Sequence, residues 1–455
     1  MKDGSLKSSF VLHLASFLMM TYDDAIAWWY ARIDFERRAP QPGDLKLDQI
    51  RALLALLGDP HRRLRIVHVA GSKGKGSTAA MLARALRAAG YRAGLFTSPH
   101  LCAVEERIQV DGVPISCDEL AALLTEIRDA LPDSLQPTFF ELATALGFLH
   151  FVRRRVDLAV VEVGLGGRFD STNICQPLLA IVTSISLDHT KILGDTLARI
   201  AFEKAGILKP GRPVVSGVLA PDARDVIEHL AAERCCPLTQ LGRDIHFTYR
   251  PGNVEREPPT VAVRTRERSW PALPLGLLGA HQAANAACVV ACVEQLRRFG
   301  LSIRDADVAA GLAEVDWPAR LEILGRAPWV VLDCAHNTAS VQALIDTLDE
   351  SFPPGRRFLI LAASSDKDVP GMIALLAPHF HRFLLTRYAQ SQRAVPPEQL
   401  AKHLLQAGNA SFEIYAVASA AWHAARTQAG PKDLIAATGS VFLAGELRPL
   451  MAQVH

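Results

Sequence analysis

Residues 68–81, HVAGSKGKGSTAAM, form a glycine-rich stretch between two different patterns of secondary structure. The stretch that leads into it, residues 65–69, is short and rich in β-branched side chains, which favours a strand. After it, apolar side chains repeat on one helical face until Gly90 ends the pattern. A glycine loop between a strand and a helix lets backbone N–H groups surround an anion at the helix N-terminus. The stretch therefore predicts a phosphate-binding loop.

This loop departs from the common phosphate-loop pattern G-x-x-x-x-G-K-[ST]. Gly74 comes too early, and Gly76 separates Lys75 from Ser77. We expect Lys75 to reach the β- and γ-phosphate oxygens, and Ser77 or Thr78 to offer a hydroxyl to Mg²⁺. The alternative is a flexible basic turn, because glycine motifs alone are weak signals. The strand and the helix on either side favour the phosphate-binding loop.

Composition limits the classes of protein that fit the chain. Its 455 residues are enough for two or three domains, and 49% hydrophobic residues supply well-buried cores. A net charge of +2 is too small to indicate a nucleic-acid or membrane partner, whereas an anionic small molecule remains open. The eight cysteines show no C-x-x-C spacing. We therefore expect no zinc site, no disulfide framework and a cytoplasmic protein.

The first twenty residues resemble the beginning of a signal peptide, with early lysines and an apolar run over 10–20. The run is too short to span a bilayer, and no small-residue cleavage site follows it. We expect residues 1–19 to be an N-terminal extension outside the fold. A natural start at Met19 or Met20 is favoured over secretion.

Strand-like and helical runs alternate along the rest of the chain. Apolar strands without polar alternation, separated by amphipathic helices, predict a doubly wound, mostly parallel α/β domain over 20–316. Residues 245–276, rich in Arg, Pro and Thr, predict a short β excursion before a long helix. A new β/α series opens after the pattern breaks near Asp316. It predicts a smaller, Rossmann-like α/β domain over 317–455.

Polar residues lie where the apolar strands of the first domain end, which is where ligands bind on this architecture. Glu162 interrupts the apolar run LAVVEVG, and Asp188 and His189 end the run SISLDH. A carboxylate in a buried strand is costly unless it is paired or binds a metal. Glu162, His189 and a hydroxyl of the loop form a candidate Mg²⁺ site. The alternative is an ordinary structural ion pair.

Many short motifs follow one another in order: GSKGKGS, TSPHL, EERIQVDG, TFFELAT, VEVGLGGRFDSTN, SLDHTKILG, EKAGILK, GAHQAANA, WPARLEIL, DCAHN, SSDKD and TGSVFLAGE. Together they resemble the folylpolyglutamate synthase/dihydrofolate synthase family of the Mur ligase superfamily over residues 22–447. The phosphate loop of this family usually reads G-T-N-G-K-G-S, so the extra glycine fits the family. Ser72 and Lys73 stand where the family has Thr and Asn, and Cys334 and Thr338 stand where it commonly has Gly and Pro.

The resemblance implies a role for each matching residue. The residues implied in ATP binding are Lys73, Gly74, Lys75, Gly76, Ser77, Asn285, Arg320 and Asp333. Those implied in binding two Mg²⁺ ions are Ser98, Glu162 and His189. Those implied around the pterin are Thr138, Phe139, Phe140, Glu141, Phe169, Asp170 and Ser171. His336 and Ser440 are implied near the incoming amino acid. Lys75, Lys204 and His336 are the catalytic candidates, with Lys204 matching a lysine that the family carbamylates. The residues alone predict an ordinary surface lysine there.

The implied reaction is ATP-dependent ligation of L-glutamate to a pterin carboxylate through an acyl phosphate. The carboxylate belongs to dihydropteroate, to a reduced folate, or to both, and the expected protein is a monomer. Two alternatives remain: another Mur-type amide ligase, and a nucleotide-dependent binding protein that makes no amide bond. The motifs TFFELAT and DHTKILG favour the folate branch over a cell-wall ligase. A binding protein has no need of Glu162, His189, Lys204 and Asp333 together.

Overall fold

The computed structural model describes residues 19–35, 44, 46–389 and 393–453. The expected N-terminal extension lies outside the described residues except for Met19. None of the described helices is long and apolar enough to cross a membrane.

The first half of the chain builds one eight-stranded sheet, in the order β4-β3-β2-β5-β1-β6-β7-β8. Its strands are β1 Ile66–Ala70, β2 Ala93–Phe96, β3 Ile108–Val110, β4 Val113–Pro114, β5 Leu158–Glu162, β6 Leu179–Val182, β7 Val214–Ser216 and β8 Leu238–Gln240. All neighbours pair in parallel except β2 with β3 and β3 with β4 at one edge. The predicted mostly parallel sheet is confirmed.

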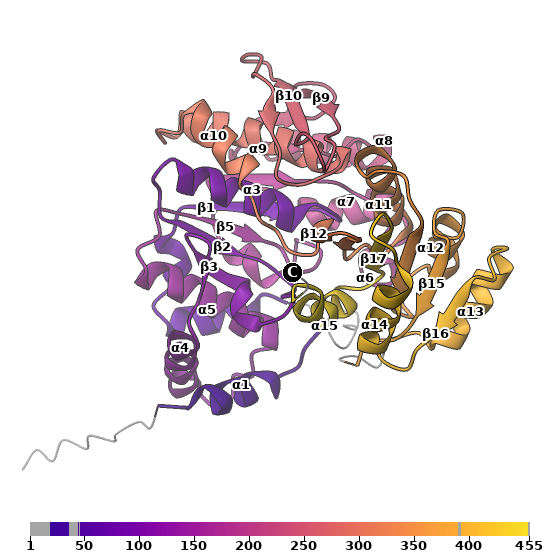
Figure 1. Ribbon diagram of the computed structural model, residues 1–455. Helices are drawn as coiled ribbons and strands as arrows, with labels where there is room; N and C mark the ends of the chain where they lie inside the picture. Colours follow the sequence, from indigo (N-terminus) through magenta and orange to yellow (C-terminus); the bar gives the residue numbers. More distant parts are fainter. Residues whose placement is uncertain (1–18, 36–43, 45, 390–392, 454–455) are drawn as a thin grey trace, which may run out of the picture.

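Helices cover both faces of this sheet, which explains why its central strands are apolar on both sides. Val67 and Val69 of β1 pack into one core with α3 Lys75–Ala88 and α9 Ala280–Arg298. Ile66 packs into the opposite core with α5 Phe139–Arg153. Figure 1 shows α3 above the sheet and α4 and α5 below it. The other helices of this half are α1 Tyr22–Tyr30, α2 Asp48–Leu56, α4 Cys117–Ala130, α6 Thr190–Leu193, α7 Leu197–Lys204, α8 Pro221–Glu233 and α10 Asp305–Ala313, with 3₁₀ turns η1 Pro60–Arg63, η2 Val104–Arg107, η3 Ser171–Ile174 and η4 Ala205–Ile207.

The expected β excursion is a three-stranded antiparallel sheet that packs against α9. Its strands are β9 His246–Arg250, β10 Thr260–Arg264 and β11 Leu273–Pro274. Val261 and Val263 of β10 point into the core that α9 shares with the large sheet, while their neighbours are exposed. The excursion therefore caps the outer side of α9, as Figure 1 shows at the top of the molecule.

The C-terminal part builds a second sheet of six strands, in the order β12-β13-β17-β14-β15-β16. These are β12 Glu322–Arg326, β13 Trp329–Leu332, β14 Arg357–Leu361, β15 Arg382–Leu385, β16 Phe412–Ile414 and β17 Leu434–Thr438. Only β12 runs antiparallel to its neighbour. The helices are α11 Thr338–Ser351, α12 Val369–Leu376, α13 Pro397–Gln406, α14 Ala418–Gln428 and α15 Val441–Met451. Separate apolar cores on the two faces of the sheet confirm the predicted smaller, Rossmann-like α/β unit.

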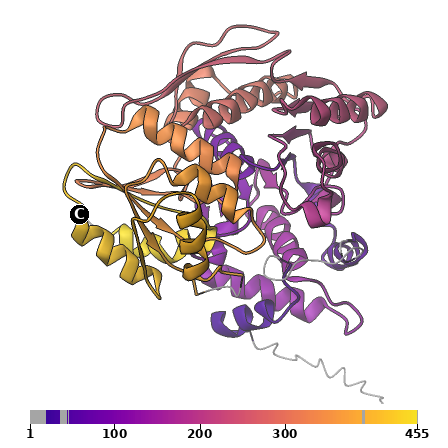
Figure 2. The ribbon, with the colours of Figure 1, turned by 90° about the vertical axis from the view of Figure 1, so that its right-hand side faces the viewer.

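The second sheet lies beside the large one, orange to yellow against purple in Figure 2. Direct contacts join the two parts, because Lys367 and His336 of the C-terminal part bond to Asp188 and Lys73. The domain boundary near Asp316 lies between the two sheets and stays a prediction.

Candidate active site

The candidate site lies at the carboxyl ends of four neighbouring strands of the large sheet. In the sheet these strands are adjacent in the order β2-β5-β1-β6. Ser98 follows β2, Glu162 ends β5, the glycine loop follows β1, and Asp188 with His189 follows β6. Parallel strands have their carboxyl ends along one edge of the sheet. Residues that follow these strands in the sequence therefore lie along the same edge.

The glycine loop between β1 and α3 is tightly enclosed. Gly74 has φ +80° and a Cβ there would lie 2.4 Å from Oδ1 of Asn285, on α9. A Cβ at Gly76 would lie 3.2 Å from the ring of Trp317. Thr183 donates a hydrogen bond to the carbonyl of Lys73 at 2.6 Å, which fixes the loop to the end of β6. The conformation of the loop is therefore fixed by its neighbours, which argues against the alternative of a flexible basic turn.

Glu162 is buried at the end of β5 and faces the loop. Lys75 Nζ lies 3.8 Å from its Oε1, and the Ser98 amide donates to its Oε2 at 3.3 Å. Burial raises the pKa of Glu162, and the positive charge of Lys75 opposes this shift. The predicted structural ion pair is thus present, and the carboxylate still lies at the mouth of the phosphate loop.

The donors around Glu162 fit Mg²⁺, because hydroxyl and carboxylate oxygens are its usual ligands. Ser77, Ser98 and Glu162 supply such oxygens, whereas His189, which is 42% exposed, follows β6, two strands away from Glu162 on β5. Among the described residues, no group of three His, Cys, Asp or Glu side chains is arranged to hold a metal ion. At nucleotide sites Mg²⁺ is usually held by one or two carboxylates together with substrate phosphates and water.

Asp188 joins the two parts of the molecule. Its carboxylate accepts from Lys73 Nζ of the glycine loop and from Lys367 Nζ of the C-terminal part, both at 2.8 Å. Burial alone would raise the pKa of Asp188, but Lys73, His189 and Lys367 outweigh it and hold the pKa well below its usual range. The sequence predicts no role for Lys367, although this lysine lies in the motif SSDKD. Nothing local to that motif shows that its lysine reaches a strand end of the other sheet.

His336 meets the glycine loop from the C-terminal side. Its Nδ1 donates to the carbonyl of Cys334 at 2.8 Å, so its Nε2 is the acceptor that receives Lys73 Nζ, also at 2.8 Å. The charge of Lys73, followed by burial, lowers the pKa of His336 well below its usual value. His336 is therefore neutral.

Arg320 and Asp333 also reach the site from the C-terminal part. Burial lowers the pKa of Arg320, but Cys334, Asp333 and Glu162 raise it further than burial lowers it, so it is charged. Asp333 accepts the amides of Leu321 at 2.9 Å and Ala335 at 2.7 Å. Asp333 thus shapes the backbone that carries Arg320 and His336.

Lys204 is buried at the end of α7, with 4% of its surface exposed. Burial, followed by the positive charge of Lys75, lowers its pKa to about 7. No hydrogen bond or ion pair to its amine is found within the part of the chain that the structure describes. The surface lysine that the residues alone predicted is wrong, because α7 packs against α8 and the backbone of Gly167, and the amine is buried where the charge of Lys75 acts on it.

Of the expected pterin residues, Phe140 and Asp170 lie beside the turn at Gly164 and Leu165, which follows β5. Thr138 and Glu141 form a capping box at the start of α5, and Phe139 is buried and stacks on Trp29 at 4.7 Å. Phe140 is half-buried with its ring against Gly164, where a Cβ would lie 2.5 Å from the ring.

Residues 165–171, which follow Gly164, contact α5 as well. Ser171 and Thr144 share a hydrogen bond at 2.6 Å, which joins this segment to α5. Asp170 is buried, whereas Phe169 is 42% exposed beneath the guanidinium of Arg168. On the C-terminal side, Ser440 is buried and caps α15, accepting the amide of Phe442 at 3.1 Å.

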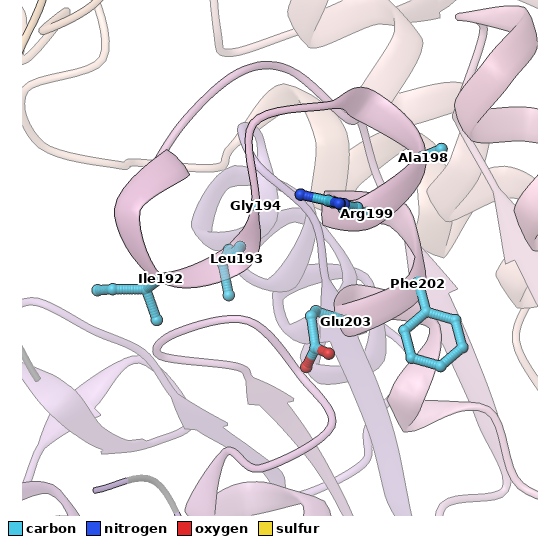
Figure 3. Close-up of a pocket in the computed structure, with 7 residues that line it drawn as sticks. All are labelled: Ile192, Leu193, Gly194, Ala198, Arg199, Phe202 and Glu203. Atoms are coloured by element: carbon cyan, nitrogen blue, oxygen red, sulfur yellow. The ribbon is translucent and has the colours of Figure 1, made fainter. Parts of the chain in front are cut away.

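A separate hollow of about 390 Å³ lies between α6 and α7. Figure 3 shows Glu203 between Leu193 and Phe202 on its wall. None of its lining residues belongs to the predicted site. The chemistry of the loop does not depend on it.

Comparison with known proteins matches two family models to this arrangement. The Mur ligase middle domain matches residues 69–293, and the Mur ligase glutamate ligase domain matches residues 319–441. The dihydrofolate synthase/folylpolyglutamate synthase of Bacillus subtilis is 36% identical over 95% of this chain and 99% of its own length. The chain belongs to the folylpolyglutamate synthase/dihydrofolate synthase family.

Solved structures of the family share the whole fold. The Mycobacterium tuberculosis folylpolyglutamate synthase complexed with ADP has a TM-score of 0.86 and 32% identity, covering 95% of this chain and 98% of its own. Escherichia coli FolC in complex with DHPP and ADP has a TM-score of 0.84 and 29% identity, covering 94% and 98%. As a member of the folylpolyglutamate synthase/dihydrofolate synthase family, the protein is an ATP-dependent ligase. A nucleotide-binding protein without ligase activity is thereby set aside.

Proposed function

We propose that this ligase joins L-glutamate to the carboxylate of a pterin substrate and accepts both dihydropteroate and reduced folates. One observation carries the proposal: Lys73 of the phosphate loop and His336 of the C-terminal part meet at 2.8 Å. A nucleotide on the loop and an amino acid at the C-terminal part would therefore lie next to each other. The gathering of Phe140 and the Asp170 segment next to Glu162 supports a flat acceptor on the other side. The relatives' names support folates over cell-wall precursors.

The proposed reaction has two steps, a phosphoryl transfer and an amide formation. A carboxylate oxygen of the pterin substrate attacks the γ-phosphorus of ATP, forming an acyl phosphate and breaking the bond to ADP. The glutamate nitrogen then attacks the acyl carbon, forms the amide and expels inorganic phosphate. Lys75 and Arg320 supply positive charge where negative charge builds up on the transferring phosphate. The C-terminal part positions the amine, which accounts for much of the rate by proximity.

The glutamate amine must lose a proton during the second step. His336 is neutral, so its Nε2 can accept that proton once Lys73 no longer donates to it. The phosphates of ATP compete for Lys73 because they carry more negative charge than the imidazole. Nucleotide binding thus frees His336 for the amine.

Mg²⁺ held by Ser98, Glu162 and His189 would supply charge neutralisation at the phosphates. Lys204 fits a carbamate beside this position, because a pKa of about 7 leaves much of its amine neutral. The neutral nitrogen adds to CO₂, forming an N–C bond and releasing one proton. A buried cation thereby becomes an anion next to Lys75, which removes the repulsion between the two lysines.

The remaining expectations belong to the same proposal. We propose a monomer that acts in the cytoplasm on small molecules, with no nucleic-acid partner. The free state of all eight cysteines agrees with a reducing compartment.

ADP release measured with the purified protein tests the proposal. ADP should form with ATP, Mg²⁺, L-glutamate and either dihydropteroate or tetrahydrofolate, and release should fall to background without glutamate or without the pterin. A cell-wall precursor in place of the pterin gives no release. Activity with that precursor and none with either pterin would replace the proposal with the other Mur-type ligase.

A further inference from the structure

Four side chains form a continuous buried hydrogen-bonded chain beneath the pterin-side segment. His68 lies in the middle of β1, and its Nε2 is 2.8 Å from Oγ1 of Thr172. The Thr172 hydroxyl bonds in turn to Oδ1 of Asp170. On the other side of the imidazole, the sulfur of Cys175 lies 3.7 Å from Nδ1. His68 and Thr172 are fully buried, so each polar atom must find its partner within this chain.

The chemistry of the four side chains fixes which atom donates and which accepts in each of these hydrogen bonds. Asp170 accepts backbone amides on both oxygens, from Thr172 at 3.0 Å and Leu165 at 2.9 Å, so it is the acceptor at the end. The Thr172 hydroxyl therefore donates to Asp170 and accepts from Nε2–H of His68. This leaves Nδ1 as the acceptor for the thiol of Cys175.

The imidazole of His68 and the thiol of Cys175 keep this arrangement at physiological pH. Burial lowers the pKa of His68 to about 3, with a further lowering by Lys209. Burial raises the pKa of the Cys175 thiol to about 12. The imidazole is thus neutral and the thiol protonated, as the directed chain requires.

Asp170 is the point where this chain acts on the candidate site. Through its two oxygens it ties the amide of Leu165, next to Gly164, to the start of η3. Its neighbour Ser171 bonds to Thr144 of α5. The segment 164–171 that closes on Phe140 therefore rests on a carboxylate whose orientation the Thr172 hydroxyl fixes.

We propose that His68 is a positioning residue for the pterin side of the site, acting through Thr172 on Asp170. Because His68 lies on β1 and the phosphate loop follows the same strand, one strand supports both the segment beside the acceptor and the loop for ATP. The inference rests on the proposed function for the identity of the acceptor. It assigns a use to a buried histidine that the reaction itself does not need.

Paired substitutions at Thr172 and His68 test the inference in the full-length enzyme. Thr172→Val removes the hydroxyl at constant shape, and Thr172→Ser keeps it. His68→Leu removes the donor, and His68→Gln retains an N–H at about the place of Nε2. Losing one buried hydrogen bond should raise the KM for dihydropteroate by about tenfold in Thr172→Val and His68→Leu. The KM for ATP stays unchanged, and Thr172→Ser and His68→Gln return the pterin KM toward that of the unmodified enzyme.

Thr347→Val is the matched control, because Thr347 is equally buried and donates to a helix carbonyl in the C-terminal part. It should lower the melting temperature without a selective change in the pterin KM. The same pterin KM in Thr172→Val as in Thr347→Val, or parallel losses for ATP and pterin, would overturn the inference and leave His68 a structural residue.

Amide hydrogen exchange gives a second readout that needs no pterin. Exchange in residues 164–172 should be faster in Thr172→Val and His68→Leu than in the unmodified chain, with the phosphate loop unchanged. Unaltered exchange in this segment would overturn the inference even if the enzyme used another acceptor. A failed turnover of the unmodified protein, by contrast, would overturn the proposed function.

Discussion

At the scale of single residues, Lys204 connects burial most directly with chemistry. An ordinary lysine has a pKa of 10.5 and is almost fully protonated at neutral pH, so it reacts poorly with CO₂. Because the pKa of Lys204 is about 7, we predict that its carbamate forms increasingly from about pH 6 to about pH 8 at fixed dissolved CO₂. Carbon-13 NMR of the protein under labelled CO₂ measures this directly. No carbamate signal at any pH in that range would remove Lys204 from the mechanism.

Stability provides an independent check on Lys204. A lowered pKa means that the unfolded chain binds a proton between about pH 7 and 10.5 that the folded chain does not. Without CO₂, the contribution of Lys204 to stability therefore rises with pH through this window. Lys204→Met should be inactive but folded, with a higher melting temperature than the unmodified protein at pH 7.5, and the difference should shrink toward pH 10. A lower melting temperature would mean that the amine has a stabilising partner.

Lys75 should matter for turnover and little for the fold. Its amine faces Glu162 and the mouth of the loop, so Lys75→Ala removes charge at the transferring phosphate. We predict a loss in kcat on the order of 10²–10³-fold, measured by ADP release. Lys191→Ala, at an exposed lysine of α6, is the control and should stay fully active. Near-normal turnover in a folded Lys75→Ala protein would exclude the loop as the phosphate site.

Among the elements, the two ends of α3 allow the effect of backbone strain to be distinguished from that of a steric clash. Gly74 and Gly90 flank α3 with φ +80° and +86°, so alanine is strained at both. A Cβ at Gly74 would collide with Asn285, whereas nothing lies within 4 Å of one at Gly90. Gly90→Ala should cost only about 1 kcal/mol of stability. Gly74→Ala should lose ATP binding as well, measured by calorimetry, and equal ATP affinity in the two variants would contradict the assignment of the loop.

The positions of whole strands could be predicted from the sequence better than the burial of single side chains. The carboxyl ends of parallel strands lie along one edge of a sheet, so the placement of Ser98, Glu162 and His189 along that edge could be predicted from the sequence. Side-chain burial depends on packing between distant segments, so the sequence did not predict the buried amine of Lys204. The motif TFFE alone does not show which of its residues stabilise the helix and which face the substrate. In the structure Thr138 and Glu141 cap α5 and Phe139 lies in the core.

For the molecule as a whole, Asp188 of the first part is linked to the C-terminal part through Lys367, while Lys73 of its own part shares the carboxylate. Breaking a buried ion pair costs several kcal/mol when one charge is left alone, but Lys73 still compensates Asp188 here. We predict that Lys367→Met weakens the contact between the two parts by on the order of 1–2 kcal/mol. Small-angle scattering should then report a larger radius of gyration, with a reduced kcat. Lys402→Met, at an exposed lysine of α13, is the control and changes neither. An unchanged radius and kcat in Lys367→Met would show that the pair does not hold the parts together.

In the proposed reaction, ATP activates the carboxylate of the acceptor between the two parts of the molecule. Dihydropteroate labelled with ¹⁸O in its carboxylate tests this claim most directly, because the attacking oxygen stays with the phosphate when glutamate displaces it. Mass spectrometry of the inorganic phosphate after turnover with ATP and L-glutamate should find one ¹⁸O atom for each amide formed. Unlabelled phosphate accompanying labelled amide would contradict the acyl phosphate and the role assigned to the site.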